Sequence, residues 1–128
     1  MLLHAHSGFR YLALLVGIMV IAYAVSGMVT ERAYDQRMRV LAAAFMGFVD
    51  VTILLGFAIV FTARVRPTGL GAHIVMALLA TTVSHIVYSV QKRRPPAERT
   101  YPPHIVGTLI VLALIAWGLV AIGRPVVG

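Results

Sequence analysis

The sequence predicts an all-α fold: a single integral membrane domain over residues 1–128, built as an up-down bundle of four helices. Hydrophobic residues make up 60% of the chain and charged residues only 12%, a balance far from that of soluble proteins. Four apolar runs, at about 9–29, 40–63, 70–91 and 104–123, are separated by short polar links. Because a helix needs ~20 apolar residues to cross ~30 Å of hydrocarbon, each run is long enough to span a membrane.

The first helix is expected to begin near Phe9, because Ser7 stands where a helix N-cap is favoured. His6 would then lie just outside the helix and Arg10 in its first turn. The apolar run is longer than the about 7–15 residues of a secretory signal core, which favours a permanent span. Mostly small residues follow one stripe and predict a face turned into the bundle, since small side chains let helices approach closely. This stripe consists of Arg10, Ala13, Gly17, Val20, Ala24 and Gly27.

The second helix carries Asp50, the one acidic residue inside a predicted span. A carboxylate at mid-bilayer costs at least ~2.5 kcal/mol on insertion scales, so a buried Asp50 must be protonated, paired or facing water. Packing and functional roles for it are both open. Ala43 and Gly47, on the same side, form a small-x-x-x-small pair that predicts a close helix contact.

The third helix carries two histidines, His73 and His85, in a setting that penalises polar groups. Their separation of twelve residues places them ~18 Å apart along the helix axis and ~120° apart around it. We therefore expect them to meet different neighbours near opposite membrane surfaces. The face that includes His73 is small and polar, and continues through Ala77, Ala80, Ser84 and Tyr88.

The fourth helix is expected to begin near His104, because Pro102 and Pro103 suit a first turn and not a helix interior. His104 would then lie at the inner membrane surface. Trp117 is an expected interfacial anchor near the outer end.

Basic residues are divided unevenly between the two ends of the predicted bundle. One end has seven, Arg32, Arg37, Arg39, Lys92, Arg93, Arg94 and Arg99; the other has four, Arg10, Arg64, Arg66 and Arg124. The positive-inside rule therefore places both termini on the outer, periplasmic side of a bacterial cytoplasmic (inner) membrane. Because these residues flank the apolar runs, the formal charge of +7 needs no nucleic-acid partner.

The histidines divide by depth, with His4, His6 and His73 at the outer side and His85 and His104 towards the inner side. In an up-down bundle the first and third helices are diagonal, so His6 and His73 are expected to face each other across a central ligand. Two opposed histidines are the axial pair that a b-type haem requires. His85 and His104, from neighbouring helices, are further candidates for cofactor binding. The candidates for holding haem propionates are Arg10, Arg64 and Arg66.

Two other uses of these side chains remain open. His4, His6 and His73 with a water would make a three-histidine zinc site. Asp50 and His85 would suit a proton relay, as in a small proton-coupled transporter. The chain has no cysteine, which excludes iron–sulfur clusters and covalently attached haem. It also lacks a phosphate-binding loop, a nucleophile elbow and paired carboxylates, which excludes kinase and hydrolase chemistry.

A short internal echo links the two halves of the chain. Ala5-His6 and Ala72-His73 are 67 residues apart, and each precedes an apolar helix, a basic link and a second helix. A true repeat would make two hairpins related by an axis along the membrane normal.

Several short motifs together resemble a family of small four-helix bacterial membrane proteins often labelled cytochrome b-like. They are His4-x-His6-Ser7-Gly8-x-Arg10, Leu54-Leu55-Gly56, His73-x-x-Met76 and Arg124-Pro125. The resemblance implies a haem-compatible four-helix bundle. A histidine often stands in the second helix of that family roughly where this chain has Asp50, so haem binding here would depend on the remaining histidines.

We therefore expect a membrane electron-transfer protein that binds haem b and is linked to quinone or to a larger redox complex. It would be an electron carrier or a subunit rather than a stand-alone enzyme. The alternative is a cofactor-free accessory subunit of a respiratory or photosynthetic membrane complex, with the histidines as packing contacts. In either case the expected partners are lipid and other membrane subunits or further copies of this chain.

Overall fold

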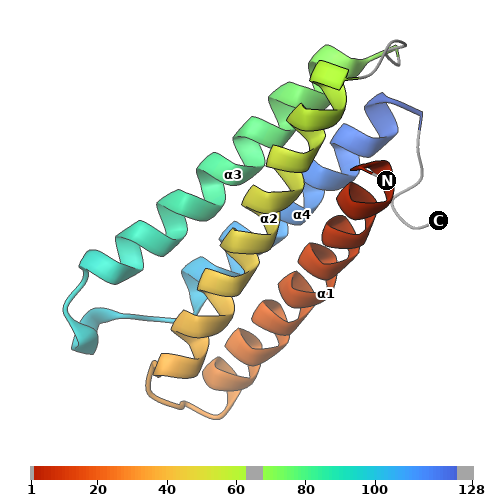
Figure 1. The fold of residues 1–128 in the computed structure, drawn as a ribbon. Coiled ribbons are helices and arrows are strands. Elements are labelled where there is room, and N and C mark those ends of the chain that lie inside the picture. The colour runs from red at the N-terminus through yellow and green to blue at the C-terminus, as the bar shows by residue number, and fades with distance from the viewer. Residues whose placement is uncertain (1, 63–67, 124–128) are drawn as a thin grey trace.

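The computed structural model describes residues 2–62 and 68–123, and most of them are helical (Figure 1). The helices are α1 (Leu2–Val29), α2 (Gln36–Thr62), α3 (Leu70–Arg93) and α4 (Pro102–Ala121), with a short 3-10 turn, η1 (Pro96–Glu98), before α4. All four α-helices are long and apolar enough to cross a membrane. The prediction of an all-α, four-helix protein is confirmed.

The four helices form an antiparallel ring in which each packs against two neighbours. The most extensive contacts join α1 to α2 and α3 to α4, whereas α2 and α3 share the least extensive contact of the ring. α1 and α3 are therefore diagonal. Figure 1 shows that α1 begins at the end of the bundle where α4 finishes, which we call the terminal end. The links 30–35 and 94–101 lie at the opposite end, which we call the link end.

α1 begins at Leu2, well before the predicted start near Phe9, so the predicted N-cap role of Ser7 is wrong. Ser7 lies inside the helix, and so does His6. The reason is tertiary packing, because Leu3, His6, Ser7 and Arg10 recur at helical spacing and line one internal cavity. The polar character of the segment concealed this inward face.

The other helix boundaries have local causes. α2 begins at Gln36, before the predicted residue 40, because Asp35 caps it: the backbone N–H of Met38 donates to Asp35 Oδ1 over 3.0 Å. α4 begins at Pro102 and has both prolines in its first turn, where a missing N–H is tolerated.

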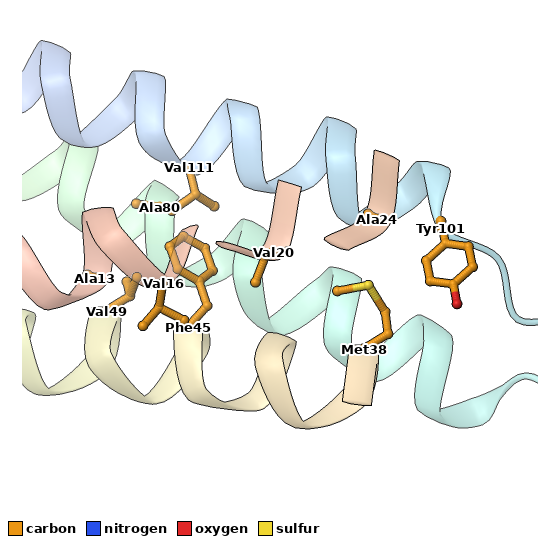
Figure 2. Packing of buried hydrophobic residues seen from close by; sticks show 10 residues of the cluster. All are labelled: Ala13, Val16, Val20, Ala24, Met38, Phe45, Val49, Ala80, Tyr101 and Val111. Carbon is orange, nitrogen blue, oxygen red and sulfur yellow. The ribbon is translucent and has the colours of Figure 1, made fainter. Parts of the chain in front are cut away.

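The inward stripe predicted for α1 is confirmed, since all six of its residues are buried. Figure 2 shows Ala13, Val20 and Ala24 of this stripe packed with side chains from the other helices. Gly17 permits a close approach to α2, because a Cβ there would lie 2.9 Å from Cε1 of Phe45. Small residues on α1 therefore bring α2 and α4 close enough to form one core.

The predicted helix contact at Gly47 is not made within the described part of this chain. A Cβ at this position would meet no atom within 4 Å, so Gly47 faces open space and not another helix of this chain. Val49 provides the physical reason: it is buried in the core, and at ~100° per residue Gly47 lies ~160° around α2 from it.

The two hairpins, α1–α2 and α3–α4, match each other over more of the chain than the histidines alone. Glu31-Arg32-Ala33-Tyr34 and Glu98-Arg99-Thr100-Tyr101 precede α2 and α4, and they are again 67 residues apart. The extensive contacts within each hairpin agree with this internal correspondence. Each hairpin thus carries a histidine on its first helix and a Glu-Arg-x-Tyr motif in the link before its second helix.

Candidate functional site

A cavity of about 310 Å³ lies between the four helices at the terminal end of the bundle. Most of its wall is aliphatic, and the short residues Gly56, Ala77 and Gly118 help to leave the space open. The polar side chains in the wall are those of His6, Ser7, Arg10, Thr52 and His73. A mainly apolar cavity with a few convergent polar groups is the usual form of a small-molecule or cofactor site.

His6 and His73 reach this cavity from the diagonal helices α1 and α3. The Nδ1 of His6 lies 2.8 Å from the carbonyl oxygen of Thr52, and the Nδ1 of His73 lies 2.7 Å from that of Gly118. A carbonyl oxygen only accepts, so Nδ1–H donates in both contacts and Nε2 carries the lone pair in the neutral ring. Metal-ligating histidines are commonly oriented by this kind of hydrogen bond.

These two hydrogen bonds occupy corresponding places in the two hairpins. Each joins a histidine on the first helix of a hairpin to the backbone of the second, across 46 residues for His6 and 45 for His73. Glycine also lies beside each ring: a Cβ at Gly56 would be 3.1 Å from Cε1 of His6, and one at Gly118 would be 3.3 Å from Nδ1 of His73. The repeated hairpin therefore places an oriented imidazole on each side of the cavity.

Arg10 contributes a buried positive charge to the cavity wall. The residue is only 5% exposed, and its Nε has no hydrogen-bond partner among the described residues. Its guanidinium carbon lies 4.7 Å from the centroid of the Tyr11 ring, a cation–π contact. Because a buried charge is costly unless it is paired, this wall favours an anionic group on any ligand.

The zinc arrangement is not assembled in the part of the chain that the structure describes. His4 is exposed and does not line the cavity, and the described residues contain no group of three potential metal ligands. His4 does not line the cavity with His6, because a separation of two residues along a helix corresponds to a rotation of ~200° about its axis. The predicted propionate ligands Arg64 and Arg66, like Arg124, lie outside the described residues.

Asp50 and His85 form a separate group on the outer side of the α2–α3 contact. Nε2–H of His85 donates to Asp50 Oδ2 over 2.7 Å, and the hydroxyl of Thr81 donates to Asp50 Oδ1. The side chains of His85 and Asp50 are 50% and 33% exposed, so Asp50 is not the buried carboxylate that was expected. Its position on α2, ~100° around from the buried Val49, turns it towards α3 and the surface.

His104 lies at the link end, far along α4 from the cavity. It is 1% exposed, and its Nε2 lies 2.7 Å from the Tyr34 hydroxyl, with which it shares a hydrogen bond. The two rings stack with centroids 5.5 Å apart. His85 and His104 therefore do not form a common site, because each has its own partner.

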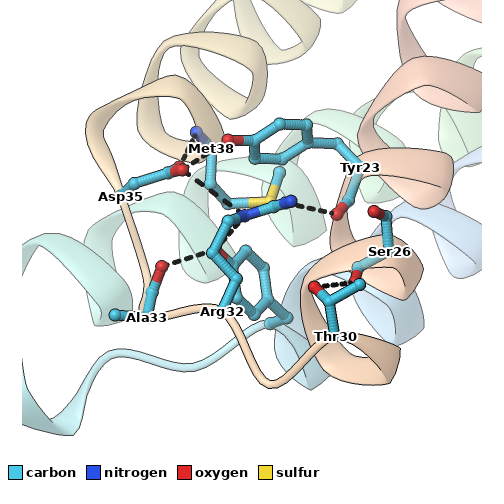
Figure 3. A network of polar contacts seen from close by, with 8 residues as sticks. Tyr23, Ser26, Thr30, Arg32, Ala33, Asp35 and Met38 are labelled. Atoms are coloured by element: carbon cyan, nitrogen blue, oxygen red, sulfur yellow. Dashed lines mark hydrogen bonds and ion pairs between the residues drawn. The ribbon is translucent and has the colours of Figure 1, made fainter.

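A polar network around Arg32 holds the link between α1 and α2 (Figure 3). Arg32 donates through Nη2 to the carbonyl oxygen of Tyr23 over 3.1 Å and through Nε to the Tyr101 hydroxyl over 3.3 Å. Its guanidinium also lies 4.2 Å from the centroid of the Tyr23 ring and forms an ion pair of 3.6 Å with Asp35. The Tyr101 hydroxyl donates to the carbonyl oxygen of Ala33 over 2.8 Å.

The pKa values of Tyr34 and Asp35 in this link depart from their ordinary ranges. Burial raises the pKa of Tyr34 to about 12, so its hydroxyl stays protonated beside His104. Burial alone would raise the pKa of the Asp35 carboxyl, but hydrogen bonds from Tyr23 and the Met38 N–H, together with Arg32, outweigh it and lower that pKa. The link end is thus held by a neutral tyrosine and an ionised aspartate.

The aromatic residues of the link end were not predicted from the sequence. The signal that identifies them is the repeated Glu-Arg-x-Tyr motif, which contributes Tyr34 to one hairpin and Tyr101 to the other. Hydrophobic periodicity could not find these residues, because they lie in links where no helical period applies. Asp50 was found, but its contacts with Thr81 and His85 depend on how α2 and α3 are aligned.

In comparisons with known proteins, no protein-family model, no curated protein and no solved structure matches this chain. The site must therefore be interpreted from its own geometry.

Proposed function

We propose that this chain is an integral membrane protein that binds a b-type haem between its helices, through His6 and His73, and transfers electrons to or from quinone or a larger redox complex. The observation that carries the proposal is the pair of histidines on diagonal helices, both lining one apolar cavity and both oriented through Nδ1. The proposal includes the orientation inferred from the basic residues, with both termini on the periplasmic side.

The donor set of the cavity fits haem. In an imidazole whose Nδ1 donates to a carbonyl oxygen, Nε2 is the nitrogen that would bind iron. Bound haem would supply a one-electron redox couple. Arg10 would offset the negative charge of a propionate, and the aliphatic wall would exclude water.

The volume of the cavity fits haem less well than its donor set does. At about 310 Å³ it is at the low end of ligand sites, which extend from ~300 to ~1,000 Å³. A macrocycle would need movement of wall side chains such as Ile53 and Phe57 on α2. The α2–α3 contact is the least extensive of the ring, so this side of the wall is the one expected to yield.

The experiment is purification in mild detergent from haem-replete cells, followed by oxidised and reduced absorption spectra. We expect a Soret band and a reduced α-band in the wild type, and loss of both in His6→Ala and in His73→Ala. His4→Ala is the matched control, because His4 is exposed on the same helix and should leave the spectrum unchanged. Ala77→Leu should also abolish the bands by filling the cavity.

Haem absent from a folded wild-type protein, or retained by both histidine variants, would reject the proposal. Addition of imidazole to His73→Gly is a further check, since a free ligand should partly restore the spectrum if His73 binds iron.

The small volume of the cavity favours a second candidate, a cofactor-free accessory subunit of a larger membrane complex. In that case His6 and His73 are packing residues whose Nδ1 atoms join α1 to α2 and α3 to α4. Isolation in mild detergent separates the candidates, because the subunit would copurify with other membrane proteins and show no haem spectrum.

A further inference from the structure

The group formed by Asp50, Thr81 and His85 has no role in the cavity, and its position is unusual for polar side chains. Asp50 lies near the middle of α2 (Gln36–Thr62), ~20 Å along the axis from the start of that helix. In the membrane location proposed above, a carboxylate and an imidazole at this depth face hydrocarbon, because half of the His85 side chain and a third of that of Asp50 are exposed. Such groups are costly in lipid unless something polar covers them.

Each carboxylate oxygen of Asp50 accepts a hydrogen bond from within the chain, and His85 is the more exposed partner of the pair. The Thr81 hydroxyl donates to Oδ1 of Asp50, and Nε2–H of His85 donates to Oδ2. The His85 side chain is half exposed, and Nδ1 is its second ring nitrogen. A neutral ring offers an acceptor there and a protonated ring offers a donor, so the group can bind a hydroxyl or a carbonyl oxygen.

Open space lies beside this ring. Gly47 precedes Asp50 by one turn of α2, and since α2 and α3 are antiparallel it lies level with His85 and Ile86. A Cβ at Gly47 would meet nothing within 4 Å. The surface of α2 one turn from Asp50 is therefore free of side-chain contacts within the described residues.

The surroundings of the polar group are aliphatic on both helices. Leu54 is 68% exposed, Leu78 44% and Ile86 55%. A ligand that matches this surface needs a small polar ring, to meet His85, and an apolar tail, to lie along the aliphatic side chains. It must also reach the middle of the bilayer by lateral diffusion.

The group is also adjacent to the cavity. Val49 and Ala80 line the inner part of the cavity, and their chain neighbours Asp50 and Thr81 share a hydrogen bond on the outer side of the same two helices. A ligand at His85 would thus be separated from a cofactor in the cavity by little more than the α2–α3 wall.

We propose that the Asp50–Thr81–His85 group and the space at Gly47 form a lateral binding site for the head group of a lipid-soluble quinone or hydroquinone, with Nδ1 of His85 bonding to a ring oxygen. Asp50 is a positioning residue, because it acts by holding the imidazole. The choice of quinone over other amphiphilic rings rests on the proposed electron-transfer function, whereas the location of the site rests on the geometry of α2 and α3.

The test is photoaffinity labelling with an azido-ubiquinone analogue, using the protein in lipid nanodiscs and mapping labelled peptides by mass spectrometry. We expect labelling of the α2 and α3 peptides that contain Gly47, Leu54, Leu78 and Ile86. His85→Leu should reduce it at least tenfold by removing the hydrogen bond, and Gly47→Leu should do the same by filling the space. Asp50→Asn should reduce it less, because an asparagine still holds Thr81 or His85.

Thr82→Val is the matched control: Thr82 is an exposed neighbour of Thr81 whose hydroxyl donates to the carbonyl oxygen of Leu78, and its labelling should equal that of the wild type. Gly47→Leu keeps the test valid if His85→Leu does not fold, because its added side chain extends into open space. Labelling spread evenly over all helices, or unchanged in both variants, would overturn the proposal.

The experiment is run on haem-free and haem-loaded protein, which separates it from the test of the proposed function. Site-specific labelling of haem-free protein supports the quinone site even if no preparation shows a haem spectrum. A haem spectrum without site-specific labelling leaves the proposed function standing and rejects this inference. A dimer that Gly47→Leu converts to monomers would also reject it, since a second copy of the chain would then cover the group.

Discussion

The two ends of the bundle are built from the same pair of hairpins, yet one is open and the other is filled. At the terminal end, short residues such as Gly56 and Ala77 leave a cavity of about 310 Å³ with a histidine on each diagonal helix. At the link end, Tyr34 and Tyr101 fill the corresponding space, and the gap beside His104 is only about 10 Å³. The side chains that line the two ends therefore differ in size.

This contrast shows why the histidines of one chain have different roles. His73 lines the cavity and bonds through Nδ1 to Gly118, whereas His104 stacks on Tyr34 and uses its Nε2 in a hydrogen bond. A histidine that is already stacked and bonded has no position for a ligand. Single substitutions at the two ends test whether the link end is fully packed and whether the terminal end has room for added atoms.

The largest effect is expected from Gly27→Ala. The new Cβ would lie 2.5 Å from Cζ of Tyr101, whose hydroxyl is bonded to Ala33, so the ring cannot move freely. We expect a loss of ~1–3 kcal/mol in the free energy of unfolding, the usual cost of overpacking. The measurement is unfolding in detergent, by heat or by added SDS.

Two variants complete this comparison. Ala77→Leu adds more atoms at the terminal end, but because they enter the cavity we expect a change within about 1 kcal/mol. Gly47→Ala is the control for helix propensity, since its Cβ meets nothing, and should stabilise by up to ~1 kcal/mol. Equal losses in Gly27→Ala and Ala77→Leu would show that the two ends do not differ in packing.

An effect of at most the same size is expected from Tyr34→Phe. The ring stack remains, but Nε2 of His104 is left buried without its partner, at a cost of ~1–3 kcal/mol. Tyr88→Phe, on a tyrosine beside the same gap, should change stability by at most ~0.5 kcal/mol. If the two variants are equally stable, the Tyr34–His104 bond does not hold the link end.

The pH dependence of Tyr34→Phe gives a second measurement. Because the pKa of Tyr34 is raised to about 12 in the folded protein, the stability that it contributes is complete below pH ~10 and is lost as the pH rises towards 12. The stability of the wild type should therefore fall towards that of Tyr34→Phe over this interval of pH. A constant difference would contradict the burial of the hydroxyl.

The smallest effect is expected from Asp35→Asn, which keeps the N-cap of α2 and removes the charge beside Arg32. Both side chains are about one-third exposed, so we expect a loss below ~1 kcal/mol at neutral pH. The folded-state pKa of Asp35 is lowered, hence the advantage of the charge is present above pH ~4 and disappears as the pH falls further. Unfolding measured from pH 7 to pH 3 checks this; a difference that persists at low pH would contradict it.

Much of this architecture could be predicted because it depends on composition and on the period of the helix. Four apolar runs predict four helices, and the small stripe from Arg10 to Gly27 predicts the inward face of α1. Short links make successive helices antiparallel neighbours, which puts α1 and α3 on a diagonal. The placement of His6 and His73 at one end follows from the same reasoning.

Other features required the tertiary structure. α1 begins at Leu2 because its first turns face the cavity, which no local signal indicates. Asp50 meets His85, and not another side chain at a similar depth, because of the rotation and the axial alignment of α2 against α3. Gly47 faces open space although its spacing is typical of a helix contact.

By itself, then, the sequence determined the number of helices, their order and the face that α1 turns inward, because burial of apolar surface and the ~100° turn per residue act within each segment. Only the tertiary structure decided which polar side chains meet. A shift of one residue along a helix rotates a side chain by ~100° about the helix axis. That rotation is enough to move a side chain from the cavity that His73 lines to the outer surface on which His85 lies.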